Sequence, residues 1–141
     1  MATKDIKLLG TIDGIFYANF SDICMENYQV ILIDGEQKII QQIIKFILTE
    51  RGTLPLFPNY GTSITKSLNQ KALEVSLEDI KNEIVYGVKY IQEQNVNDDI
   101  NIKDIKDLQL KIINQQELNV RMSISLTNGS VLTLNENMNL K

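Results

Sequence analysis

Alternating apolar and polar residues mark the C-terminal third of the chain. Every second residue from 118 to 126 is apolar, and residues 108–112 alternate in the same way. A period of two predicts strands that bury one face and leave the other in contact with solvent. The polar residues of the longer strand are expected on its outward face: Asn119, Arg121, Ser123 and Ser125.

The dipeptide Asn128-Gly129 predicts a hairpin that joins this strand to residues 130–135. A two-residue loop would set leucines opposite serines, whereas a three-residue loop over 127–129 sets apolar residues opposite one another. The longer loop also places Gly129 where a left-handed backbone is required, so we expect it. The resulting pairs are Ile124 with Leu132 and Met122 with Leu134.

Three shorter strands are predicted near the N-terminus. Residues 6–8 alternate apolar with charged side chains. After the turn at Asp13-Gly14, the apolar residues Phe16, Ala18 and Phe20 share one face of a second strand. The β-branched run at 29–33 is typical of a buried strand. Residues 21–27 are interpreted as a connector.

Two long helices are predicted between the strand regions. Apolar residues at 40–48 fall on one helical face, and this helix should end near Thr49 to Gly52, because Gly52 suits a C-terminal cap. A second helix begins near Ser76, with a capping-box pattern, and continues to about Asn95. Residues 63–69 are compatible with a short helix.

The order β-β-β-α-loop-α-β-β-β predicts an α+β fold. We expect two main helices packed on a small, mostly antiparallel sheet, with a C-terminal β-hairpin. The length of 141 residues fits one domain, so residues 1–141 are interpreted as a single unit. A hydrophobic fraction of 43% and a charged fraction of 23% are ordinary for a globular domain and argue against disorder.

The net charge of −4 argues against a nucleic-acid partner, because phosphate binding requires clustered lysines and arginines. The mixed-charge run from Lys103 to Lys111 alternates in sign and is interpreted as a solvated strand face. The longest apolar stretch, Ile39–Leu48, contains polar residues and is too short to cross a membrane. The N-terminus lacks the apolar centre of a signal peptide. We therefore expect neither a nucleic-acid nor a membrane partner.

Candidate chemistry is sparse. The chain has no histidine, which removes Ser-His-Asp and Cys-His mechanisms, and its single cysteine, Cys24, is interpreted as a small buried residue. A glycosidase needs two carboxyl groups at a defined separation, whereas acidic residues on helices are usually solvated. We therefore expect no catalytic site and no cofactor. The glutamates considered for such a pair are Glu36, Glu50, Glu74, Glu78 and Glu83.

Residues 95–101 begin like a calcium-binding loop, with a polar residue at every second position. Ile100 then stands where a glycine is needed, and Lys106 stands where a bidentate glutamate is needed. This segment is interpreted as a polar turn before a strand, and no metal site is expected.

The segment GTLPLFPNYG, residues 52–61, contains both prolines and is called the proline loop below. Proline fixes its own φ and restricts the residue before it, so the composition predicts a rigid loop. Its apolar side chains indicate packing against another surface. We expect five residues to be more ordered and more buried than those of an ordinary loop: Pro55, Leu56, Phe57, Pro58 and Tyr60.

The segment from Ile39 to Gly61, IIQQIIKFILTERGTLPLFPNYG, resembles the contractile-tail baseplate wedge family, also called sheath initiators. The family pattern is an apolar helix ending in Leu-Thr, then Gly-Glu-Arg, a proline, a second proline, an aromatic residue and a glycine. The resemblance covers roughly residues 28–135. The matching residues are Leu48, Thr49, Gly52, Pro55, Pro58, Tyr60 and Gly61.

Two departures from the family pattern concern its arginines. The Glu-Arg that follows the glycine in the family is Thr53-Leu54 here, and the later Glu-Pro-Arg corresponds to Glu93-Gln94-Asn95, where only the glutamate remains. Glu50 and Arg51 are the candidates to replace part of that polar network.

The resemblance implies an architectural role. Family members sit in the baseplate wedge of a virion tail or phage-derived injection particle made in the host cytoplasm, and present a β element on which the first sheath ring assembles. The implied partners are wedge scaffold proteins and the tail sheath protein, with tail tube or hub proteins as further candidates. We expect an edge strand, from residues 118–127 with 130–135 or from Ile6–Leu8, to pair with the sheath subunit.

Two other functions stay open at this level. Family members have carried a lysozyme-like label, so a peptidoglycan-cleaving enzyme is one alternative. A generic adaptor outside any tail is the other, because neither composition nor periodicity specifies a baseplate.

Overall fold

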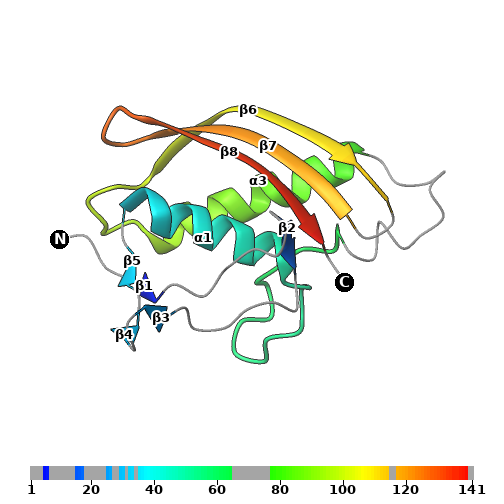
Figure 1. The fold of residues 1–141 in the computed structure, drawn as a ribbon, viewed down its shortest axis with the longest axis horizontal. Helices are drawn as coiled ribbons and strands as arrows, with labels where there is room; N and C mark the ends of the chain where they lie inside the picture. The colour runs from blue at the N-terminus through cyan, green and yellow to red at the C-terminus, as the bar shows by residue number, and fades with distance from the viewer. Residues whose placement is uncertain are drawn as a thin grey trace.

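A computed structural model describes residues 5–6, 15–17, 25–26, 29–30, 32–33, 35–64, 77–114 and 117–139. Its main body is one curved sheet laid over two helices, α1 (Gly35–Leu48) and α3 (Leu77–Gln94). Figure 1 shows both helices on the same face of the sheet. This arrangement confirms the predicted α+β class.

The sheet has the strand order β2-β8-β7-β6. Its three long strands, β6 (Ile102–Ile112), β7 (Glu117–Leu126) and β8 (Val131–Asn139), are consecutive and antiparallel. The short β2 (Ile15–Tyr17) joins the end of β8 in parallel, over residues 137–139.

The hairpin of β7 and β8 has the predicted register. Ile124 pairs with Leu132 and Met122 pairs with Leu134, and Gly129 adopts a φ of 89° in the loop. The five alternating apolar residues of β7 are each at most 1% exposed, so they form the inward face: Leu118, Val120, Met122, Ile124 and Leu126.

The core lies between this inward face and the helices. α1 contributes its predicted apolar stripe, and α3 contributes residues at helical spacing that continue to its end. The helices approach closely at Gly87, where an added Cβ would lie 2.5 Å from the Cδ1 of Phe46. Burying this cluster removes the apolar surface of both layers from water.

The N-terminal strands differ from expectation. The run at 29–33 is divided into β4 (Gln29–Val30) and β5 (Leu32–Ile33). β4 pairs with β3 (Met25–Glu26), inside the expected connector, and β5 pairs with β1 (Asp5–Ile6). A β-branched run predicts extended backbone but carries no information about its partner, and here two different strands pair with its two halves.

Two helix boundaries are informative. α1 ends at Leu48, and Gly52 lies in the turn beyond that end with a φ of 90°, so it does not directly cap the helix. α3 ends at Gln94, as predicted. The expected short helix at 63–69 lies outside the described residues except for its first two positions, of which Ile64 is fully buried.

Candidate functional site

The base of the proline loop is fixed by backbone hydrogen bonds across its neck. The Arg51 N–H donates to the Thr62 carbonyl oxygen at 3.0 Å, and the Thr62 N–H donates to the Thr49 carbonyl oxygen at 2.9 Å. The buried Thr62 hydroxyl also donates to the Ile47 carbonyl oxygen at 3.1 Å. The neck therefore continues directly from the end of α1.

Gly61 makes this neck possible. Its φ is 107°, and a Cβ built there would lie 2.6 Å from the carbonyl oxygen of Thr49 and 3.0 Å from the backbone nitrogen of Arg51. Both atoms belong to backbone that is already hydrogen-bonded, so they cannot move aside cheaply. A glycine is required here for space as well as for conformation.

The two prolines occupy equivalent places in consecutive turns. The Phe57 N–H donates to the Leu54 carbonyl oxygen, and the Tyr60 N–H donates to the Phe57 carbonyl oxygen, both at 3.1 Å. Pro55 and Pro58 are thus the second residues of these turns, the position that suits the fixed φ of proline. The spacing of three residues between the prolines thus places them in consecutive turns.

Tyr60 anchors the far side of the loop in an aromatic cluster with Phe46, Tyr86 and Tyr90. Its ring lies 4.8 Å from that of Phe46 and 5.6 Å from that of Tyr90, both edge to face. The Tyr86 hydroxyl donates to the Asn59 carbonyl oxygen at 3.2 Å. The loop is therefore held from α1, from α3 and from its own neck.

Arg51 connects the neck to α3. Its guanidinium binds the Glu83 carboxylate through two contacts, of which the shorter, Nη2 to Oε2, is 2.5 Å. It also lies 5.1 Å from the centre of the Tyr86 ring. Arg51 thus joins the neck to Glu83 and Tyr86 of α3. Glu50 instead accepts hydrogen bonds from Thr53 through its backbone carbonyl oxygen.

The tip of the proline loop is exposed, which corrects part of the expectation. Leu56 is 85% exposed, Phe57 is 54% exposed, and both prolines are exposed, whereas Tyr60 is half-buried as predicted. Apolar content indicated a buried surface, but the loop turns its tip away from the domain on the side opposite the sheet (Figure 1). Hydrogen bonds hold the turns and the neck, whereas the tip is left exposed to contact another surface.

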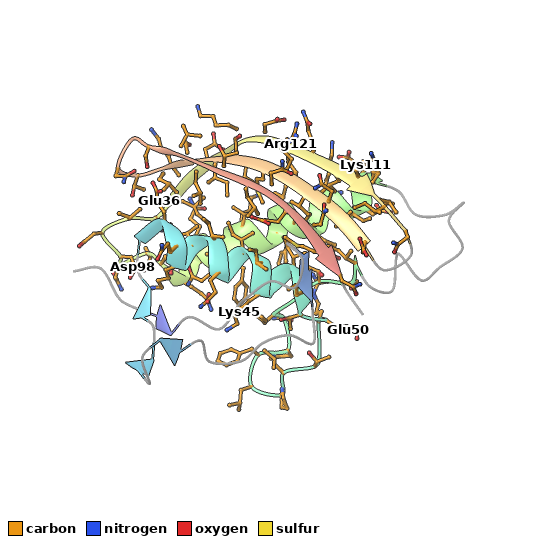
Figure 2. All side chains as sticks on the ribbon, viewed as in Figure 1. Glu36, Lys45, Glu50, Asp98, Lys111 and Arg121 are labelled. Atoms are coloured by element: carbon orange, nitrogen blue, oxygen red, sulfur yellow. The ribbon has the colours of Figure 1, made fainter. Side chains whose placement is uncertain are left out.

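A groove of about 400 Å³ runs between the loop and α1. The loop wall contributes Leu54, Phe57 and Tyr60, α1 and its C-terminal end contribute Gln42, Lys45 and Thr49, and α3 contributes Gln94. Figure 2 shows Lys45 pointing from α1 away from the sheet, toward the loop. Neither periodicity nor composition could have located this groove, because it depends on how the loop is placed relative to α1.

The candidate Glu93 is exposed on the last turn of α3, beside Gln94. The next residue, Asn95, is 2% exposed and forms a reciprocal amide pair with Gln42, through hydrogen bonds of 2.7 and 3.0 Å. The polar turn at 95–101 therefore joins the end of α3 to α1. No group of residues suited to hold a metal ion occurs in the part of the chain that the structure describes.

The candidate interface residues on β7 lie on the outward face of the sheet, as predicted: Asn119, Arg121, Ser123 and Ser125. β7 itself, however, lies between β6 and β8, so residues 118–126 offer no free edge. The expectation that this strand donates its edge is wrong, because consecutive antiparallel pairing on both sides uses its backbone groups.

In the four-stranded sheet, open edges belong to β6, to the three-residue β2 and to the part of β8 that does not pair with β2. β6 carries alternating charges and two register irregularities, between Ile102 and Asp104 and between Ile105 and Asp107. Charges and bulges on an edge oppose pairing with other chains. β8 pairs with β7 without a register shift, and β2 pairs with β8 over residues 137–139, so Val131–Glu136 have no second partner strand among the described residues.

The Leu126 N–H donates to the Ser130 carbonyl oxygen at 2.9 Å, so these residues form a hydrogen-bonded pair. Because such pairs alternate along an antiparallel ladder, every second residue of β8 directs its N–H and C=O away from β7. In the open part of the edge these residues are Val131, Thr133 and Asn135, and all three side chains are exposed.

The described carboxylates do not form a pair across the hollows that surround the loop. The groove contains none among its lining residues, and a second hollow beside Arg51 contains Glu83, which is already paired. Glu36 accepts a hydrogen bond from the Ser130 hydroxyl at 3.0 Å.

No helix among the described residues has the length and apolar character needed to cross a membrane.

Comparison with known proteins gives a likeness in fold. No protein-family model matches the chain, and no curated protein matches it in sequence. A solved structure from Geobacter sulfurreducens, described as a "putative tail lysozyme", is similar with a TM-score of 0.57 and 16% identity. The likeness covers 75% of this chain and 91% of that chain. At this identity it establishes the shared fold.

Proposed function

We propose that the chain is a structural component of the baseplate of a contractile phage-type tail, where it joins the wedge to the first sheath ring and templates sheath assembly. Two features that were found independently support this. The segment resembling the wedge family builds one rigid loop on the domain, and the domain shares its fold with a protein described as a tail lysozyme.

The observation that carries the proposal is the construction of the proline loop. Thr49, Gly61 and Tyr60 hold its neck and far side, and the two prolines set its turns. All five residues belong to the pattern that resembles the wedge family, and each holds a different part of the projecting loop. An ordered loop loses little entropy when it binds, which suits a scaffold protein.

The sheath contact is assigned to the open part of β8. Val131, Thr133 and Asn135 present backbone N–H and C=O groups that an added strand would satisfy. Their neighbours on the inward side, Leu132 and Leu134, are buried in the core and hold the edge in place. Main-chain pairing tolerates variation in side chains, which fits a template that acts on a long strand of another protein.

Proline substitutions on β8 test the sheath contact. Thr133→Pro and Asn135→Pro each remove an N–H that faces the open edge, whereas Thr133→Ala and Asn135→Ala keep it. Ile112→Pro supplies the corresponding change on the β6 edge, at a residue that is 37% exposed. All variants are first checked for native circular dichroism.

Particles that carry the two β8 proline variants should contain baseplate and tube but no polymerised sheath. The alanine variants and Ile112→Pro should assemble sheath normally. Normal sheath on both β8 proline variants would refute the template role.

The description of the Geobacter sulfurreducens protein raises an alternative, a peptidoglycan-cleaving enzyme. Against it, Glu83 is engaged by Arg51, and no carboxylate is among the described residues that line the groove beside the loop. We propose that the chain has no such activity and expect no cell-wall clearing by the purified protein. Clearing that is lost in Glu50→Gln, with folding intact, would favour the enzyme.

A further inference from the structure

The groove beside the proline loop has the composition of a docking site. One wall is apolar, formed by Leu54, Phe57 and Tyr60, and the other is polar, formed by α1. Leu54 is 39% exposed and Phe57 is 54% exposed, so apolar surface remains in contact with water along this wall. Covering it with another apolar surface is favourable.

The dimensions of the groove favour a short helix laid across it. Gln42, Lys45 and Thr49 are spaced by three and four residues, so they form one ridge of α1 about 10 Å long. That length matches two turns of a second helix. The groove volume of about 400 Å³ accommodates side chains from one face of such a helix rather than the helix itself.

Main-chain groups around the groove also favour a helix over an extended segment. The α1 backbone is hydrogen-bonded within the helix, and the carbonyl oxygens of Leu54 and Phe57 already accept turn hydrogen bonds. An extended peptide needs main-chain partners at an open edge, whereas a helix satisfies its own backbone.

Charge decides which helix fits. Lys45 is the charged residue among those lining the groove, it is half-buried, and it makes no ion pair with any residue in the described ranges. The two described ion pairs involve Lys38 and Arg51 instead. An acidic side chain on the incoming helix would give Lys45 a partner in a place partly shielded from water.

We propose that this groove binds an amphipathic helix of a partner protein, with apolar residues packed on Leu54 and Phe57 and an acidic residue bound to Lys45. The inference goes beyond the role at the sheath, because it depends on the groove alone and not on β8 or on a tail particle. The rigid loop wall lowers the entropy lost on binding.

A displayed library of helices tests the proposal with the purified chain. The library holds a constant amphipathic helix with six random surface positions, and Phe57→Ser protein is used for counter-selection. Selected helices should carry an aspartate or glutamate one turn from an apolar pair. Enrichment of sequences without an acidic residue, of proline-containing extended sequences, or of nothing above the counter-selected background would overturn the proposal.

A double-mutant cycle then assigns the charge to Lys45. The best acidic peptide and its Gln counterpart are titrated against the wild-type chain and against Lys45→Gln. We expect the acidic residue to strengthen binding about three- to tenfold in the wild type and not at all in Lys45→Gln. Lys111→Gln, an exposed lysine on β6, should keep the wild-type ratio. An equal ratio in Lys45→Gln would refute the contact.

The experiment separates this proposal from the proposed function. Failure of helix binding leaves sheath assembly on β8 untouched, because β8 belongs to the sheet, whereas Lys45, which lines the groove, points from α1 away from the sheet (Figure 2). Normal sheath on the β8 proline variants, in turn, does not alter the titration.

Discussion

Replacing Gly61 with alanine tests the mechanical account of the proline loop. The added Cβ would lie 2.6 Å from the Thr49 carbonyl oxygen and 3.0 Å from the Arg51 backbone nitrogen. Both groups are bound to Thr62 across the neck. The substitution therefore strains the backbone conformation and forces the neck apart at the same time.

Gly52→Ala is a matched control, because it strains the backbone conformation without forcing the neck apart. Gly52 also has a left-handed φ, 90°, but a Cβ there meets nothing within 4 Å. A left-handed conformation costs a non-glycine residue about 1–2 kcal/mol, so Gly52→Ala should lose about that much stability. Steric overlap with fixed backbone adds about 1–3 kcal/mol, so Gly61→Ala should lose about 2–5 kcal/mol.

Urea unfolding followed by far-ultraviolet circular dichroism measures both losses in free energy. The larger loss for Gly61→Ala should appear as a lower midpoint with an unchanged slope. Equal losses for the two variants would refute the claim that Gly61 is required for close packing of the neck.

Two further substitutions test the electrostatic contacts. Arg51→Lys should lower the unfolding free energy by about 1 kcal/mol, because lysine cannot keep both contacts to Glu83 and the stacking on Tyr86; an unchanged midpoint would contradict this. Burial raises the pKa of Glu136 above its ordinary value of 4.5. The native state therefore holds this proton more tightly than the unfolded chain, and stability is lost as pH rises through the native pKa. Glu136→Gln should raise the melting temperature at pH 7 but not at pH 4, and an equal change at both values would contradict the cause.

The sequence predicted those parts of the fold in which each local signal agrees with the others. In the hairpin, the alternation of β7 and the glycine at 129 lead to the same register, and the structure has that register. The two helices were predicted equally well, because their apolar stripes continue over several turns. Such elements can be predicted from the sequence because their turn residues and their hydrophobic pattern indicate the same structure.

The strands that form the edges of the sheet could not be predicted in the same way. Alternation along β7 shows which side chains face inward, but it does not show whether a strand lies in the centre or at an edge. The division of residues 29–33 between two partners has the same origin, because the β-branched pattern does not show which segments will pair with it. The free edge of β8 became apparent once the strand order was known.

The sequence predicted a loop restricted by its two prolines, but it did not predict that the tip of the loop is exposed. Two prolines spaced by three residues indicate consecutive turns, whichever way the loop points. Whether Leu56 and Phe57 are covered depends on the surface beyond the loop, and in this chain they are exposed. The sequence indicated Arg51 as a residue able to form polar contacts. It could not indicate Glu83 as the partner, because Glu83 lies on α3, 32 residues further along the chain.

A reconstruction of the assembled particle by cryo-electron microscopy tests the central claim most directly. The account predicts this domain in the baseplate, with a strand of the first sheath ring beside Val131–Glu136 at the spacing of paired strands, about 4.7–4.9 Å. Density for the domain away from the sheath, or an unpaired β8 edge in a particle with complete sheath, would contradict it.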